Sequence, residues 1–147
     1  MPLLNYTTTV PVHRTIGQVH ALLVAAGARQ IMTTYSGTGA PTGVSFGIAT
    51  ADGTRAFTLP VQIERVLGVM KRDKGTPQRL KTPEQAERVG WRILKDWLEA
   101  QLAILKTEMV TIDEVMLPYM RSTDGRTFYE LYADGQLMQP AIGAGDA

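Results

Sequence analysis

The sequence has no cysteine and only two histidines, and its 15 Lys and Arg residues are nearly balanced by 14 Asp and Glu residues. Without cysteine the chain can form no disulfide, thiolate zinc site, iron–sulfur cluster or cysteine nucleophile. No apolar run approaches the ~20 residues that a membrane span needs. The first residues also lack the basic and then apolar pattern of a signal peptide. We therefore expect a cytoplasmic protein of a reducing compartment that makes no contact with a membrane.

The pattern of apolar residues predicts a single α+β domain over residues 1–139 and a disordered tail over residues 140–147. Segments with period-two alternation indicate a small antiparallel sheet of about three to four strands, with Asp52-Gly53 as a hairpin turn. Segments with helical spacing indicate a first helix near 16–26, begun by a capping box at Thr15, and a second helix opened by Pro60. The expected strands are residues 4–12, 29–35, 44–49 and 55–59.

A long helix is the strongest element that the sequence predicts, and we expect the sheet to pack on it. Thr82 is a suitable N-cap, Pro83 a suitable first helical residue, and Gln85 has the spacing that completes a capping box. The apolar face between Ala86 and Leu105 is wider than one small sheet needs. We expect either self-association through this face or a purely intramolecular core. The residues predicted for an oligomer interface are Trp91 at the margin of the face, Trp97 and Leu98.

Two further capping-box spacings, Thr111 to Glu114 and Thr127 to Glu130, predict short C-terminal helices. Asp113 and Glu114 resemble a divalent-cation pair. Acidic residues are nevertheless expected in the first turn of a helix for electrostatic reasons alone. We therefore assign no metal site to them.

Charge is unevenly distributed along the chain. Nine basic and four acidic residues lie between Val61 and Lys95, a local net charge of +5. Such a stretch can form a positive patch that attracts anionic partners, or it can simply keep a helical surface solvated. The predicted nucleic-acid-binding residues are Lys71, Arg72, Lys74, Arg79, Lys81 and Arg88.

The sequence offers no pattern that indicates an enzyme. It contains no nucleophile elbow, Walker motif, dinucleotide fingerprint or zinc-ligand spacing. The glycine-rich residues 36–43 suit a long hairpin loop better than a phosphate cradle, because no Lys-Ser/Thr ending or helix follows them. His13 and His20 are the only near-neutral bases. We therefore predict no catalytic residue, no cofactor and no metal.

Aromatic residues on the expected strands allow two interpretations. Such side chains can stack on unpaired bases, or they can form the core of a small sheet. The core interpretation is the more common outcome. The residues concerned are Tyr6, Tyr35, Phe46 and Phe57.

The segments 84–102, 113–120 and 124–130 resemble a group of small phage and mobile-element proteins to which no activity is assigned. This resemblance covers most of the chain and implies a role in phage or mobile-element biology inside a bacterial host. The expected order of a helix, a three-stranded sheet and a long helix is also similar in architecture to phage single-strand annealing proteins. That second likeness is an analogy of fold, and fold does not determine function.

Two functions remain after these exclusions. The first is an oligomeric protein that binds single-stranded DNA, with a role in replication or annealing recombination. The alternative is a non-enzymatic structural or interaction protein that forms a homo-oligomeric assembly or engages a host protein. Salt-dependent binding to DNA separates the two.

Overall fold

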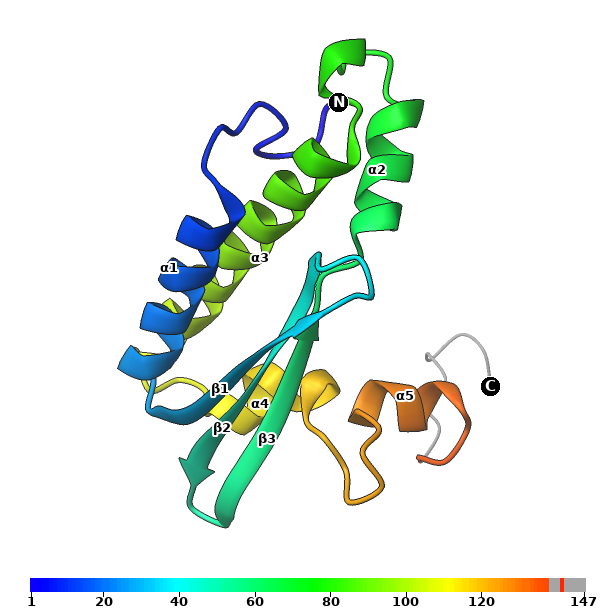
Figure 1. Ribbon diagram of the computed structural model, residues 1–147. Helices are drawn as coiled ribbons and strands as arrows, with labels where there is room; N and C mark the ends of the chain where they lie inside the picture. Colours follow the sequence, from blue (N-terminus) through cyan, green and yellow to red (C-terminus); the bar gives the residue numbers. More distant parts are fainter. Residues whose placement is uncertain (138–140, 142–147) are drawn as a thin grey trace.

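The computed structural model describes residues 1–137 and residue 141, and it confirms the α+β class. The three strands β1 (Ala28–Tyr35), β2 (Pro41–Thr50) and β3 (Gly53–Pro60) form an antiparallel sheet in the order β1-β2-β3. Helix α1 (Val12–Ala25) precedes the sheet in the chain, and the long helix α3 (Pro83–Leu105) follows it. Both helices lie on the same face of the sheet (Figure 1). The predicted C-terminal tail lies outside the described residues, except for Ala141.

The remaining elements are short. Helix α2 (Ile63–Arg72) and the 3₁₀ helix η1 (Gln78–Leu80) connect the sheet to α3. Helix α4 (Ile112–Met116), the 3₁₀ helix η2 (Leu117–Tyr119) and helix α5 (Phe128–Ala133) follow it. Thr111 and Thr127 cap α4 and α5 with complete capping boxes, so the two predicted C-terminal helices are confirmed.

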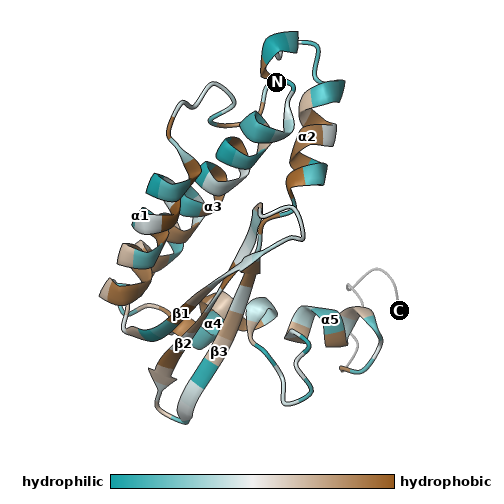
Figure 2. Ribbon diagram, in the orientation of Figure 1, coloured by the Kyte–Doolittle hydropathy of each residue, from teal (hydrophilic) through white to brown (hydrophobic). Residues whose placement is uncertain are grey.

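The main core lies between one face of the sheet and the helices α1, α3 and α4. Alternation along the strands places Val44, Phe46, Phe57 and Leu59 on this face, and each is almost fully buried. Figure 2 shows brown, apolar residues along the strands and in α1 and α3, and residues of these elements form one buried cluster. A second, smaller cluster joins α2 to the start of α3 and comprises Met70, Ala86 and Val89.

The predicted strand at residues 4–12 is wrong. These residues form two turns instead, with Tyr6 N donating to Leu3 O and Thr8 N to Asn5 O, and Asn5 has a φ of 64°. Their carbonyl groups find a distant partner in α3, which no local pattern reveals. The sheet consequently has three strands.

Two helix starts also differ from the prediction. Helix α1 begins at Val12 after Pro11, and Thr15 is a fully buried residue inside the helix rather than its cap. Pro60 ends strand β3 instead of opening α2, which starts at Ile63. At the later start of α2 the backbone has a partner that the capping pattern does not report, because Val61 N donates to Thr42 O in the neighbouring strand.

Candidate nucleic-acid interface

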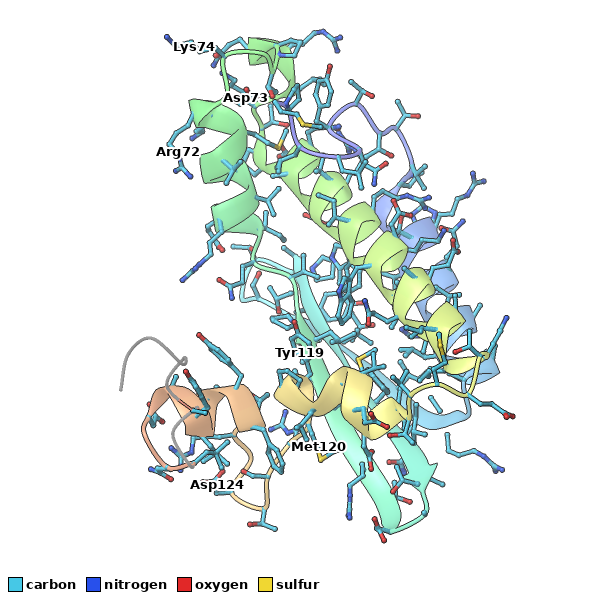
Figure 3. The ribbon with its side chains drawn as sticks, turned by 180° about the vertical axis from the view of Figure 1, so that it is seen from behind. Arg72, Asp73, Lys74, Tyr119, Met120 and Asp124 are labelled. Atoms are coloured by element: carbon cyan, nitrogen blue, oxygen red, sulfur yellow. The ribbon has the colours of Figure 1, made fainter. Side chains whose placement is uncertain are left out.

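The predicted phosphate-binding cations gather at one end of the molecule, where α2 ends, η1 follows and α3 begins (Figure 1). Figure 3 labels Arg72 and Lys74 at this end. Met70 anchors the last turn of α2 against Ala86 and Val89 of α3, and this contact places the two helix ends beside each other. We call this region the basic end and define it by the six residues Lys71, Arg72, Lys74, Arg79, Lys81 and Arg88.

The turn that follows α2 is held by the carboxylate of Asp73. Its Oδ2 accepts a hydrogen bond from Thr76 Oγ1 at 2.7 Å, and its Oδ1 accepts one from Gly75 N at 3.3 Å. The Thr76 hydrogen bond is the main reason that the pKa of Asp73 lies below its usual value. The carboxylate of Asp73, the acidic side chain in this turn, thus forms hydrogen bonds that stabilise the turn.

Most cations of the basic end face solvent without an acidic partner. Lys71, Arg72, Lys74 and Arg79 are exposed. Two others are tied to neutral groups, since Lys81 Nζ donates to the Lys71 carbonyl at 3.3 Å and Arg88 Nε donates to Gln85 Oε1 at 2.9 Å. Within the described part of the chain, none of the six forms an ion pair; those recorded involve only Lys95 and Arg126 as cations.

The N-terminal segment joins the basic end, which the sequence did not predict. Gln85 Nε2 donates to the Tyr6 carbonyl at 2.9 Å and to the Thr8 carbonyl at 3.0 Å. Gln85 was expected to complete a capping box, but its side chain binds these carbonyls, while its backbone N–H donates to Thr82 Oγ1. Asn5 adds a hydrogen bond from Nδ2 to Asp96 Oδ2 at 2.8 Å. The first turns of α3 are therefore covered on one side.

The structure corrects the predicted oligomer interface. Trp91 and Leu98 are fully buried within the chain, and Trp91 Nε1 donates to the Pro41 carbonyl at 3.1 Å. Of the three predicted interface residues, only Trp97 is partly exposed to solvent. Its ring packs edge-on against Tyr119, with ring centroids 5.6 Å apart. The apolar face of α3 is wide because the sheet, α1 and α2 all pack on it inside one chain.

The aromatic residues of the strands belong mostly to the core. Phe46 and Phe57 are buried and stacked, with ring centroids 5.3 Å apart, so neither can receive a base. Tyr35 is exposed at the end of β1. Among the described residues, Tyr129 and Tyr132 on α5 form an exposed aromatic pair, with stacked rings whose centroids lie 6.2 Å apart. The sequence does contain a signal for this pair, because residues three apart in a predicted helix lie next to each other on its surface.

The remaining candidates have structural explanations. His20 Nε2 lies 3.1 Å from Thr33 Oγ1, which links α1 to β1. The hairpin loop covers residues 36–40, closed by Ser36 N donating to the Ala40 carbonyl, and is shorter than the expected 36–43 because Pro41 already begins β2. Among the described residues no group of three His, Asp or Glu side chains is arranged to hold a metal ion.

Comparison with known proteins adds no relative on which an assignment could rest. Neither the family models, nor the curated proteins, nor the solved structures gave a match to the chain. None of the described helices is long and apolar enough to cross a membrane. The charges and contacts of the basic end are therefore the observations from which a function can be inferred.

Proposed function

We propose that the protein binds single-stranded DNA through its basic end and serves phage or mobile-element DNA metabolism in the cytoplasm of a bacterial host. The observation that supports this proposal is the cluster of exposed cations at the junction of α2, η1 and α3, which form no ion pair within the described chain. Cations that form no ion pair are free to exchange their counterion contacts for phosphates. We propose no catalytic step.

The geometry of the basic end favours contacts with phosphates over the reading of base edges. A protein that reads duplex DNA commonly inserts a free helix into the major groove. The start of α3 is not free in this way, because Gln85 binds the N-terminal segment and Ala86 is buried against α2. A cationic turn between two helices instead suits a flexible strand and gives little sequence preference.

Salt dependence tests the proposal directly. We expect a fluorescent oligonucleotide to bind the protein at low salt, with a log affinity that falls by about 0.7 per phosphate contact as log salt rises for a single strand, against about 0.9 for duplex DNA. Replacing Arg72, Lys74, Arg79 and Lys81 together with Gln should weaken binding to all sequences and reduce the slope by about 3. Thermal stability should hardly change, because these side chains face solvent or bond only a backbone carbonyl.

A matched control separates local contacts from a change of net charge. A second variant replaces four cations outside the basic end with Gln: Arg14, Arg55, Lys106 and Arg121. Both variants lose the same charge, but only the first should show a smaller slope of log affinity against log salt. Equal affinity and slope for the wild type and the first variant would remove the basic end from the site. Absence of binding by the wild type at low salt would overturn the proposal.

The alternative function is a structural or interaction protein without nucleic acid. The observation that favours it is the unpaired outer edge of β1, which carries the exposed side chains of Met32 and Tyr35. A wild-type protein that self-associates but fails to bind any oligonucleotide at low salt would support this alternative.

A further inference from the structure

The two edges of the sheet differ in how they are covered. Beside β3, the chain returns after η2: Met120 bridges to Phe57, and Arg121 N donates to the Ala56 carbonyl at 2.8 Å. Beside β1, the described chain supplies no strand at all, and β1 is the terminal strand of the order β1-β2-β3. One edge of the sheet is therefore partly closed and the other is open.

The middle of strand β1 lacks the features that normally prevent an edge from pairing, and Arg29 and two register irregularities lie toward the ends of the strand. Proteins protect open edges with charged residues, proline or a bulge along the strand. The segment from Gln30 to Tyr35 contains no charged residue and no proline, and the register irregularities lie at its two ends, between Ala28 and Gln30 and between Thr34 and Tyr35. Met32 is 57% exposed and Tyr35 is 61% exposed. The middle of β1 thus offers a regular edge on which Met32 is the exposed apolar side chain.

We propose that the open edge of β1 pairs in antiparallel orientation with β1 of a second copy of this chain, so that two three-stranded sheets join into one. This inference goes beyond DNA binding and does not depend on it. The segment is self-complementary about Met32, because a two-fold axis there sets Gln30 opposite Thr34 and Met32 opposite itself. These three side chains alternate with Ile31 and Thr33, which are half-buried on the helix-covered face. The pairing therefore brings polar side chains together at its ends and apolar ones at its centre, with no like charges opposed.

The expected association is modest in strength. A single pair of short strands buries less than the ~1,200 Å² that is typical of stable complexes. We therefore expect reversible dimers whose population depends on protein concentration. A partner of a different kind, such as an extended peptide, would leave the chain monomeric at all concentrations.

Sedimentation velocity on the full-length protein without DNA tests the pairing, from about 10 μM to about 1 mM. The wild type should shift from monomer to dimer over this range. Met32→Lys should raise the concentration at the midpoint at least tenfold, because it places like charges opposite each other at the axis. Met109→Lys is the matched control, since Met109 is 70% exposed in the loop after α3, and it should dimerise like the wild type.

The absence of native cysteine permits a second measurement. Cα atoms of directly opposed residues in an antiparallel pair lie about 4.5–5.5 Å apart, which suits a disulfide. Met32→Cys should therefore form a covalent dimer under mild oxidation, whereas Ala49→Cys, on the central strand, should remain monomeric.

Three outcomes would overturn the proposal. The first is a wild type that stays monomeric at the highest concentration. The second is a Met32→Lys variant that dimerises as well as Met109→Lys. The third is equal cross-linking, or none, in the two cysteine variants at a concentration where sedimentation shows dimers. None of these outcomes affects the DNA-binding proposal, which is tested by the salt series.

Discussion

Trp91 joins α3 to the sheet with both its ring and its N–H group. The ring is fully buried, and Nε1 donates to the carbonyl of Pro41 at the start of β2. Trp97, two turns further along, is only partly buried and packs edge-on against Tyr119. The two tryptophans therefore provide a comparison between a buried hydrogen bond and a largely apolar contact.

We expect Trp91→Phe to lower the free energy of unfolding by more than Trp97→Phe does. The first change removes apolar contacts and also leaves the buried Pro41 carbonyl without its donor, which costs about 1–3 kcal/mol in addition. Urea denaturation followed by circular dichroism measures both values. Equal losses for the two variants would show that the hydrogen bond contributes nothing.

The carboxylate of Asp124 is held by a local network of hydrogen bonds. Its carboxylate accepts hydrogen bonds from Arg126 Nε at 3.0 Å and Nη2 at 2.7 Å, and from Ser122 Oγ at 2.6 Å. The hydrogen bonds from Arg126 are the main reason that the pKa of Asp124 is well below its ordinary value. Arg126 also donates to Asp134 beyond α5, so the two acids and the arginine hold the loop and the helix together.

The sign of the pH effect follows from this depressed pKa. The interactions are fully present above the unfolded value of about 3.9 and are lost as pH falls toward the folded pKa. Measured relative to the intrinsic exchange rate at each pH, the amides of residues 122–134 should therefore exchange faster in acid, while the core amides remain protected. Asp124→Asn should show the faster exchange already at neutral pH. An acid-insensitive loop in the wild type would contradict the expectation.

At the scale of elements, α5 depends on its cap more than α3 does. Helix α5 has six residues, none of them fully buried, and Thr127 and Glu130 form its capping box. Short helices without strong packing are marginal, so loss of the cap should unravel much of the element. Helix α3 has 23 residues and a buried face, which maintain the helix even without its Thr82 cap.

We expect Thr127→Ala to abolish the amide protection of α5, because an N-cap contributes about 1 kcal/mol. Thr82→Ala should lower the global stability by a similar amount, but the amides of α3 should still exchange together with the core. Hydrogen exchange followed by NMR distinguishes local from global opening. Retained protection in α5 of the first variant would show that packing, and not the cap, forms this helix.

The elements that the sequence predicted share a local cause. Thr82, Thr111 and Thr127 cap their helices through backbone groups three residues away, so their role is visible in the sequence itself. The N-terminal turns could not be predicted in this way, because the partner of the Tyr6 carbonyl lies 79 residues further along the chain. The sequence predicts Trp91 at the margin of the apolar face of α3, whereas the residue is fully buried. The cause is again non-local, because only the tertiary structure shows that α3 is contacted from more than one side.

At the scale of the whole molecule, the position of the basic end could be predicted from the sequence. Whether its cations are paired with acidic residues could not be predicted. Its residues are close in sequence and lie on the end of α2, the start of α3 and the segment between them, so their gathering follows from the chain order. Whether acidic residues neutralise them depends on packing: Asp73 is engaged by Thr76, and Glu84, in the first turn of α3, is paired with none of them. The sequence could not supply this information, and it is the information on which the proposed function rests.

The position of the N-terminal segment has a practical consequence for labelling the protein. Pro2 lies against Gly75, and Gln85 binds the segment to α3, so a tag fused ahead of Met1 would emerge at the basic end (Figure 1). An acidic tag there would occupy the cations and mimic a loss of affinity. A fluorophore attached near Asp52, in the β2–β3 turn at the opposite end of the molecule, would report binding without this interference.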